Sequence, residues 1–506
     1  QPIGNWDTSN VTNMNNMFDY YYISPMIFNQ NIGNWDVSNV TDMYRMFGKC
    51  TSFNNGGSPS ISGWDTSSVT TMRQMFMNCD SFNQPIGSWD TSKVTEMRDL
   101  FDACTVFNQP LGNWDISSVT SIGSMFRDCK AFDQDLSNWQ VSGATSMGST
   151  FRGCWVFNNG GSTGINNWDT SSCTNMGYMF ADATGFNQPI GNWDTSNVTD
   201  MSFMFGYYYR SPMTFNQDIG NWNVGNVTNM YRMFGRCESF NNGGSPSISG
   251  WDTSSVTTMR QMFQNCSSFN QPIGSWNTSK VTDMRDVLDY CSVFNQPIGA
   301  WDTSSVTQMG SMLRGCVAFD QGLSNWQVSG VTNMGSTFRG CHVFNNGGST
   351  GINNWNTSSC TTMNYMFADC TGFNQPINNW DMSNVTNMDS MFRAFYRSPM
   401  NFNQPIGDWN TSSLTNIYRA LYGNTSFDQD LSNWNVANIT NATDFMGNCT
   451  LSTTNYDRTL SGWSSQSVQN GVSIHFGNSK YSTATGLAYR NALVSAGWTI
   501  TDGGAA

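Results

Sequence analysis

Residues 82–97 read Phe-Asn-Gln-Pro-Ile-Gly-Ser-Trp-Asp-Thr-Ser-Lys-Val-Thr-Glu-Met, and this segment recurs with small changes along most of the 506-residue chain. The tryptophan marks the register, because its step is always either 25, as from Trp64 to Trp89, or 29, as from Trp35 to Trp64. A fixed period of this length is typical of repeat architectures. The seventeen tryptophans in register are Trp6, Trp35, Trp64, Trp89, Trp114, Trp139, Trp168, Trp193, Trp222, Trp251, Trp276, Trp301, Trp326, Trp355, Trp380, Trp409 and Trp434.

The order of long and short steps from Trp6 to Trp193 is repeated from Trp193 to Trp380, so that seven coils form a super-repeat. Residues 1–10 and 188–197 are identical, which indicates a recent duplication. Because Gln1 falls in the middle of a coil, we expect further sequence to precede it. The predicted organisation is a repeat region over residues 1–450 and a C-terminal capping region over 451–506. The repeat region divides into super-repeats 1–187 and 188–374 and a partial copy, 375–450.

The sequence of each coil predicts three short elements: two extended pieces and one or two helical turns. Phe82, Ile86 and Trp89 are apolar anchors in a brief strand, and the Asp-Thr-Ser that follows forms a turn whose side chains bond nearby backbone amides. Val94 to Met97 predicts a second extended piece. Residues 72–79, Met-Arg-Gln-Met-Phe-Met-Asn-Cys, have apolar spacings of three and four, which predict one or two helical turns.

A coil of this size buries its apolar face only by stacking on its neighbours. The sequence therefore predicts a β-rich solenoid of about seventeen stacked coils, with a parallel sheet on one side and short helices on the other. Strand spacing would separate coils by about 4.8 Å. From Leu451 the tryptophan register is expected to be lost. Residues 481–497 predict an amphipathic helix that Gly497 closes, and 498–502 a final strand, so that 451–506 forms an α/β cap.

Composition excludes some functions. The chain has a formal net charge of −13, and an acidic surface repels nucleic-acid phosphates, so we expect no nucleic-acid partner. No run of 18 apolar residues is present, so we expect no membrane span.

The repeated units resemble the BspA-like leucine-rich-repeat surface proteins, and so does the tail from Leu460-Ser-Gly-Trp463 to Gly497-Trp-Thr-Ile-Thr-Asp-Gly-Gly504. The resemblance covers nearly the whole chain. It implies a leucine-rich-repeat-like solenoid that is secreted or held at a cell surface and that takes part in adhesion or surface structure.

Catalysis is not expected. Side chains copied in coil after coil serve the scaffold, since an active site needs one unique constellation. The two histidines, His342 and His475, stand in unlike contexts. We therefore predict no enzymatic activity, no catalytic or metal-ligating residue and no cofactor. Isolated calcium sites at the repeated Asp-Thr-Ser turns are an open alternative, although Asn277 and Asn356 replace the aspartate in some coils.

Most of the fourteen cysteines occupy one position of the coil, which favours a column of buried thiols over disulfides. Two pairs are candidates for disulfides because both members recur together in the two super-repeats: Cys154 with Cys173, and Cys341 with Cys360. The Asn-x-Ser/Thr sequence is frequent. The candidate glycosylation sites are Asn277, Asn356, Asn410, Asn424 and Asn441.

Four-residue insertions of two kinds interrupt the coils: an Asn-Asn-Gly-Gly loop and a tyrosine-rich loop. Adjacent tyrosines cannot all point inward, and exposed aromatic rings are enriched where partners or sugars bind. Loops that fold back and bury their rings are the alternative, and both interpretations stay open. The candidate partner-binding residues are Tyr20, Tyr21, Tyr22, Tyr207, Tyr208, Tyr209 and Tyr396.

Two functional hypotheses follow. The first is an extracellular or cell-surface structural and adhesive rod that contacts other proteins or surface glycans and self-associates into filaments in one variant. The second is a carbohydrate-binding surface module that uses the tyrosine-rich loops.

Overall fold

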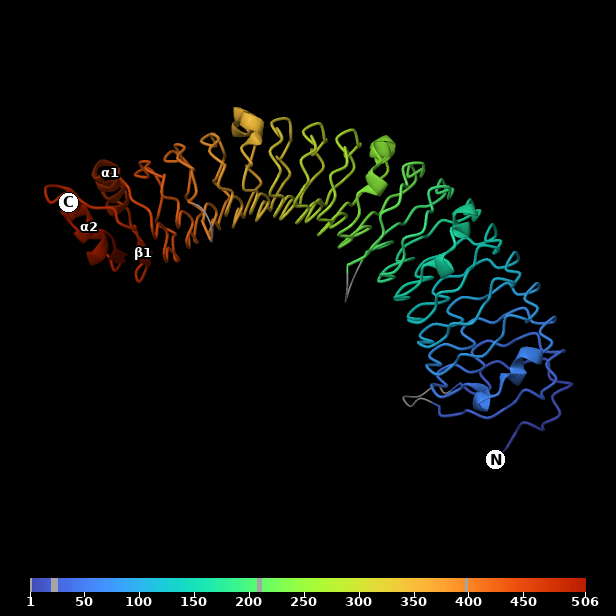
Figure 1. Ribbon diagram of the computed structural model, residues 1–506. Helices are drawn as coiled ribbons and strands as arrows, with labels where there is room; N and C mark the ends of the chain where they lie inside the picture. The colour runs from blue at the N-terminus through green and yellow to red at the C-terminus, as the bar shows by residue number, and fades with distance from the viewer. Residues whose placement is uncertain (1, 20–25, 207–211, 396–398) are drawn as a thin grey trace. The chain divides into compact units, whose positions relative to one another are not determined.

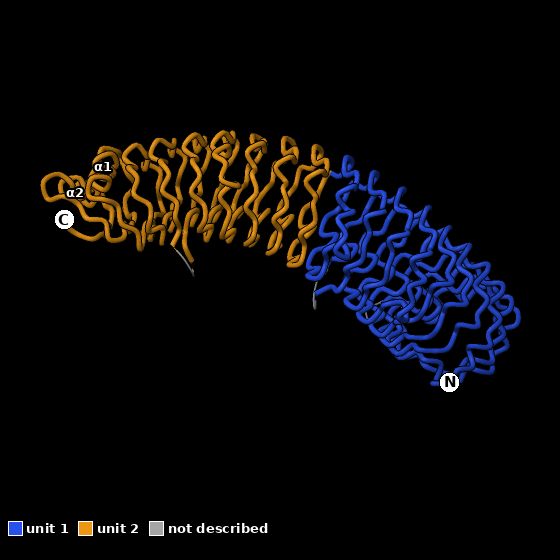
Figure 2. Tube along the Cα trace, turned by 45° about the horizontal axis from the view of Figure 1, so that its top comes forward, with its two compact units in different colours: residues 1–256 blue, residues 257–506 orange. Residues whose placement is uncertain are grey.

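The computed structural model describes residues 2–19, 26–206, 212–395 and 399–506 (Figure 1). Internal contacts divide the chain into two compact units, residues 1–256 (unit 1) and 257–506 (unit 2), which Figure 2 colours separately. In both units the chain runs through successive coils that lie side by side (Figure 1). The predicted boundary at residue 450 lies within unit 2 and stays a prediction.

Within each unit, parallel backbone pairing joins neighbouring coils. In unit 1 a row of isolated parallel bridges runs from Asn13–Asp42 to Asp200–Asn229, and in unit 2 a second row runs from Thr258–Asp283 to Asn416–Asn441. The predicted direction of pairing is therefore confirmed. The predicted continuous parallel sheet is too extensive, because each coil contributes only one bridging residue, within the Val-Thr-x-Met piece.

The predicted short helices of the Met-x-x-Met-Phe segment are replaced by turns. Met75 N–H donates to the Met72 carbonyl within the coil, at 3.1 Å, but Gln74 and Phe76 N–H donate to carbonyls of the next coil, both at 3.0 Å. Gln74 also has a φ of 58°, which a right-handed helix does not allow. Hydrogen bonds to the neighbouring coil use the backbone N–H groups that would otherwise form the hydrogen bonds of a helix.

Columns of aromatic rings fill the core of each unit, as predicted. Trp64 and Trp89 stack with ring centroids 5.9 Å apart, and Phe82 and Phe107 stack at 5.7 Å. Most of the tryptophans also bond to the preceding coil, as Trp114 does when its Nε1–H donates to the Ile86 carbonyl at 3.0 Å, whereas the buried Trp64 Nε1 lacks a partner among the described residues. The repeated tryptophan thus supplies both buried apolar area and a satisfied polar group.

The Asn-Asn-Gly-Gly insertions form pairs of short 3₁₀ helices (Figure 1). Gly56 and Gly57 have φ angles of 60° and 80°, a left-handed conformation that glycine adopts without steric cost. The 3₁₀ helices of the described residues are η1 (Asn55–Gly57), η2 (Pro59–Gly63), η3 (Asn159–Gly161), η4 (Gly164–Asn167), η5 (Asn242–Gly244), η6 (Pro246–Gly250), η7 (Asn346–Gly348) and η8 (Thr350–Asn354).

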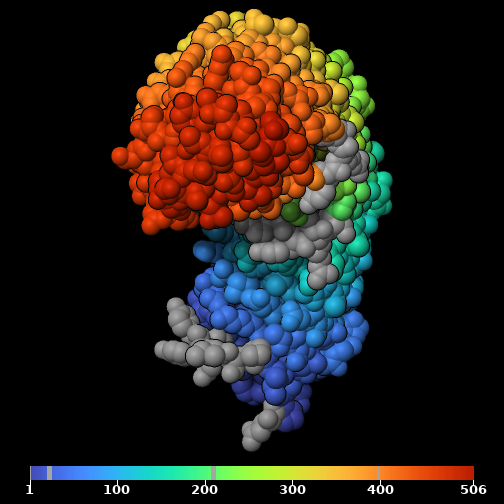
Figure 3. Space-filling view, turned by 90° about the vertical axis from the view of Figure 1, so that its left-hand side faces the viewer, coloured from blue at the N-terminus to red at the C-terminus, as the bar shows by residue number. Residues whose placement is uncertain are grey.

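The C-terminal segment contains α1 (Thr453–Ser464), β1 (Ser473–His475), α2 (Gly486–Ser495) and β2 (Thr499–Thr501). β1 and β2 pair in parallel, and Gly497, with a φ of 96°, follows α2. The helix and final strand predicted here are present, although α2 begins a turn later than expected. Figure 3 shows this segment in red on the surface at the end of unit 2.

The expected loss of the tryptophan register after Leu451 is wrong. The step from Trp434 to Trp463 equals the longer step of the coils, and the Trp463 indole N–H donates to the Leu431 carbonyl at 2.8 Å, as in the coils before it. Here the residues around the tryptophan form α1, a helix that the sequence did not predict. Gly462 permits the close approach, because a Cβ at this position would lie 2.1 Å from the Ser432 carbonyl oxygen.

Within the described ranges, none of the helices combines the length and apolar content that crossing a lipid bilayer requires.

Candidate functional site

The predicted partner-binding tyrosines, Tyr20, Tyr21, Tyr22, Tyr207, Tyr208, Tyr209 and Tyr396, lie outside the described residues. The residues beside the second loop form an aromatic and cationic cluster in unit 1. Phe203 stacks on Tyr178 with centroids 4.5 Å apart, meets Tyr231 edge-on at 4.9 Å and lies 5.3 Å from the Arg232 guanidinium carbon. Phe203 itself is buried, so the groups beside this loop that could stack on a partner or make cation–π contact are the half-buried Tyr178, Tyr231 and Arg232.

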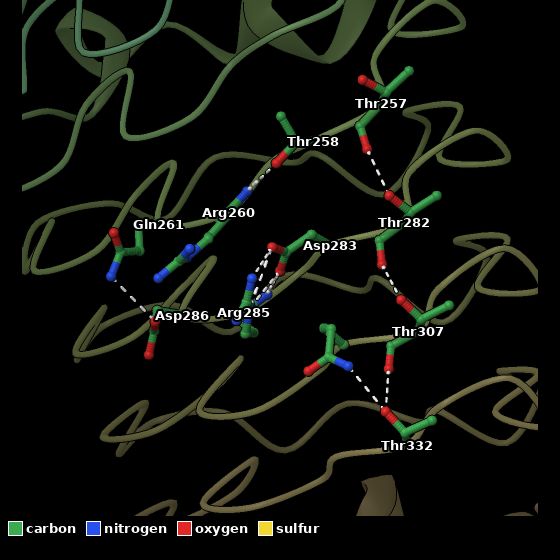
Figure 4. Close-up of polar contacts among 11 residues, drawn as sticks. Thr257, Thr258, Arg260, Gln261, Thr282, Asp283, Arg285, Asp286, Thr307 and Thr332 are labelled. Atoms are coloured by element: carbon green, nitrogen blue, oxygen red, sulfur yellow. Dashed lines mark hydrogen bonds and ion pairs between the residues drawn. The ribbon is translucent and has the colours of Figure 1, made fainter. Parts of the chain in front are cut away.

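A threonine column runs along the bridging side of each unit. In unit 2, Thr282, Thr307 and Thr332 each donate their hydroxyl to the carbonyl of the threonine one coil earlier, at 3.3–3.5 Å (Figure 4). In unit 1, Thr41 donates to Thr12 in the same way, at 3.2 Å. Each hydroxyl reinforces the contact between coils, so the repeated threonine serves the stack.

The cysteines are buried free thiols. Cys79 and Cys104 donate to the Phe47 and Phe76 carbonyls of the preceding coils, each at 3.0 Å, and burial raises the pKa of both thiols well above its ordinary value. The reactive form of cysteine is the thiolate. A thiol whose pKa is raised in this way is inert as a nucleophile or metal ligand at neutral pH.

The disulfide candidates also carry free thiols. Cys154 donates to the Phe126 carbonyl at 2.9 Å, whereas Cys173 donates to the Asn175 carbonyl at 3.3 Å. Cys341 and Cys360 likewise bond to two different carbonyls. The structure therefore gives each sulfur its own backbone acceptor. The two disulfide pairings stay predictions, which counting the free thiols of the purified chain can test.

The repeated aspartates stabilise turns, as predicted. Asp90 Oδ1 accepts hydrogen bonds from the Ser92 backbone N–H at 3.0 Å and from the Ser92 hydroxyl at 2.7 Å, and these bonds lower the pKa of the carboxyl. Asn277 accepts the same two bonds from Ser279. Since an amide replaces the carboxylate without loss of the turn, the charge itself is dispensable there. Among the described residues, no group of three or more His, Cys, Asp or Glu side chains could hold a metal ion.

The candidate glycosylation sites differ in accessibility. Asn277, Asn356 and Asn410 use Oδ1 to accept the backbone N–H two residues later, which leaves Nδ2 outside that bond. Exposed Asn441 accepts the Thr443 N–H in the same way. Asn424 is fully buried and its Nδ2 donates to the Phe402 carbonyl at 2.9 Å, so the folded chain does not offer this nitrogen for modification.

Buried ion pairs between coils escaped the sequence analysis. Arg314 Nε donates to Asp289 Oδ1 at 2.7 Å, and the Asp289 side chain is fully buried. Arg127 binds Asp102 with the same geometry one super-repeat earlier. Burial is the largest influence on the pKa of Asp102 and raises it. The only signal in the sequence was an Asp and an Arg at the same position of consecutive coils in both super-repeats.

The coils and their shared side-chain columns define a repeat protein whose copied residues bond mainly to the neighbouring copy. The chain belongs to the family described as Mycoplasma protein of unknown function, DUF285, whose profile matches residues 1–59, 57–164, 157–246, 242–351, 331–398 and 393–486. No curated protein matches the chain.

Proposed function

We propose that the chain is an extracellular or cell-surface structural and adhesive protein without enzymatic activity. In this proposal it is a leucine-rich-repeat-like solenoid of the BspA-like kind. One observation carries the proposal: the polar groups that recur from coil to coil bond to the scaffold. Thr282 and Cys104 bond to the preceding coil and Asp90 to its own turn, so the repeats supply a frame rather than reactive groups.

Duplication of the frame also duplicates what it carries. The tyrosine-rich insertions recur in each super-repeat, so one chain presents several similar loops to proteins or surface glycans. Several weak contacts on one chain give an avidity well above that of a single contact. Self-association into filaments is a variant of the same proposal, because surfaces that repeat along a chain favour regular contacts between copies.

Immunogold labelling of intact, unpermeabilised source cells tests the location. We expect label on the outer surface and binding of beads coated with the purified chain to extracellular proteins or cell surfaces. Label that appears only after permeabilisation would contradict the proposal. Electron microscopy of the purified chain separates single particles from filaments, whose axial period should match the super-repeat.

A carbohydrate-binding module that uses the tyrosine-rich loops is the second candidate. The half-buried Tyr178 and Tyr231 rings beside one loop favour it, because sugars commonly bind against aromatic rings. A glycan array probed with the wild-type chain and with Tyr207→Ala/Tyr208→Ala tests it. Equal binding by both proteins would exclude these loops as the glycan site.

A further inference from the structure

A groove with a volume of about 370 Å³ is lined by residues of five successive coils of unit 1. Its floor contains Gly123, Gly148 and Gly177, which occupy the same position in consecutive coils. Without side chains there, the surface is hollowed along the stacking direction. A volume of this size lies within the range of small-ligand sites. The polar residues that give the groove its chemistry are Arg98, Ser124, Ser149, Asn175, Tyr178 and Asp200.

Ser124 is the first group that indicates a ligand. Most of the Ser124 residue is buried, with 9% of its surface exposed, and it lines the groove, where its hydroxyl is available to a ligand. The hydroxyl can both donate and accept, which suits another hydroxyl as its partner.

The charges of the lining balance. Arg98 lies on one wall with its side chain 57% exposed, and its nearest carboxylate contact is a long one, 3.5 Å from Nε to Asp99 Oδ2. Asp200 contributes the one carboxylate of the lining, and its Oδ1 accepts the Ser202 N–H at 2.9 Å. One positive and one negative side chain leave the groove neutral, so it favours a ligand without net charge.

Tyr178 is held rigidly at the same site. Its ring stacks on Phe203, and the Arg152 guanidinium carbon lies 5.3 Å from its centroid. Asn175 is also fixed, because its Oδ1 accepts the Gly177 N–H at 2.8 Å. Fixed polar groups bind with less loss of side-chain entropy than mobile ones.

The second super-repeat provides a natural comparison, because it contains a copy of each coil that lines the groove. Gly310 and Gly335 are retained, but Asn364 stands where unit 1 has Gly177. The Asn364 Oδ1 accepts the Thr362 hydroxyl at 3.0 Å and lies so close to Gly335 that a Cβ there would be 2.4 Å away. The asparagine side chain therefore occupies the space that is open in unit 1.

The cation differs as well. Arg285, the counterpart of Arg98, folds back onto Asp283 with 2.9 Å between Nε and Oδ1 (Figure 4). In the first super-repeat Glu96 takes the position of Asp283 and no bond of this kind joins it to Arg98 among the described residues. Within the described residues, the second super-repeat thus differs from this groove both in the side chain at the Gly177 position and in the contact of its arginine.

We propose that the groove over Gly123, Gly148 and Gly177 binds a short neutral oligosaccharide. Hydroxyl, amide, guanidinium and carboxylate groups along an elongated neutral groove match the dense array of donors and acceptors on a sugar chain. The proposal goes beyond the surface role proposed above and does not depend on the tyrosine-rich loops.

Isothermal titration of the full chain with maltotriose, cellotriose and chitotriose tests the proposal. We expect at least one trisaccharide to bind, and Gly177→Asn to weaken that binding by at least tenfold because it installs the side chain that fills the second super-repeat. Gly177→Asn should fold, since Asn364 is accommodated at the matching position. Ser124→Ala should weaken binding by about tenfold through loss of one hydrogen bond. Asn364→Gly is the matched control and should leave this binding unchanged.

Two results would overturn the proposal. One is no binding of any of the three trisaccharides, and the other is equal affinity of the wild type and Gly177→Asn. A library of extended peptides run in parallel covers the competing ligand class, and peptide binding that Gly177→Asn abolishes, without trisaccharide binding, would replace the oligosaccharide with a peptide. Immunogold labelling of cells that express Gly177→Asn distinguishes failure of this proposal from failure of the proposed function. The variant should reach the cell surface as the wild type does, because the substitution affects only the groove.

Discussion

Asn55 shows how one side chain holds a loop between two coils. It is fully buried, its Oδ1 accepts the Ile32 N–H at 2.8 Å, and its Nδ2 donates to the Ser58 carbonyl at 2.7 Å. Asn55→Ala removes the side-chain partner of the buried Ile32 N–H and of the part-buried Ser58 carbonyl. We expect the free energy of unfolding to fall by about 1–3 kcal/mol for each. Urea unfolding followed by tryptophan fluorescence measures the change.

Two further variants separate the causes of that loss. Asn55 has a φ of 52°, so alanine adds backbone strain that glycine avoids. Asn55→Gly therefore reports the amide bonds alone. The exposed Asn34→Ala should change stability by no more than about 0.5 kcal/mol. If Asn55→Ala behaved like Asn34→Ala, the proposed role of the amide would be wrong.

The cysteines give a second test at the residue scale. Burial raises the pKa of Cys173 and of Cys360 to about 11, so alkylation of the native chain at neutral pH should be slow. In denaturant without reductant we expect fourteen reactive thiols. A count of ten, four fewer, would instead support the pairs Cys154–Cys173 and Cys341–Cys360. Mass spectrometry after alkylation distinguishes the two counts.

The Asp-x-Ser turn links stability to pH at the scale of the element. Hydrogen bonds from Ser92 and Ser117 lower the pKa of Asp90 and Asp115 below 3.8. The folded state then binds fewer protons than the unfolded state, so this stabilisation is present above about pH 4 and is lost as pH falls through the folded-state pKa. Asp102 acts in the opposite sense, because burial raises its pKa and its contribution is lost as pH rises.

We expect the turn to dominate, since it recurs in many coils, whereas the Asp102 and Asp289 pairs occur once in each super-repeat. Tryptophan near-UV circular dichroism should be retained at pH 5 and lost below about pH 4. Asp90→Asn/Asp115→Asn should fold, as Asn277 does in its own turn, and should unfold at a lower pH than the wild type. An unchanged acid transition in this double variant would count against the turns as its origin.

The same scale shows what the sequence could and could not predict. The Trp89 register identified the coil, the Asp90 turn and the aromatic columns, because each depends on residues that recur at one spacing. The spacing of Met72 and Met75 led to the wrong prediction of a helix. The Gln74 N–H instead donates to the Arg98 carbonyl of the next coil, and the sequence of a single coil carries no information about that contact. The groove was missed for the same reason: its three glycines form a feature only after the coils align.

At the scale of the whole molecule, contacts between coils follow the repeat length. Trp139 Nε1–H reaches the Leu111 carbonyl of the preceding coil, and the next tryptophan, Trp168, reaches Leu136 across one of the longer steps. Stability in such an arrangement is approximately a sum over coils and over the interfaces between neighbours. The length of the chain is then adjustable by whole coils but not by parts of one.

Removal of one complete coil tests this arrangement. Deletion of residues 115–139 takes out one of the shorter coils, joins Trp114 to Gln140 and places Arg152 where Arg127 faced Asp102. Neighbours of the same kind then meet across the new interface, so we expect a folded chain with tryptophan near-UV circular dichroism close to that of the wild type. Deletion of residues 115–136 removes only part of the same coil and shifts every later side chain out of its column, and this chain should lose its cooperative thermal transition. Equal behaviour of the two deletions would show that the tryptophan register does not govern how the coils stack.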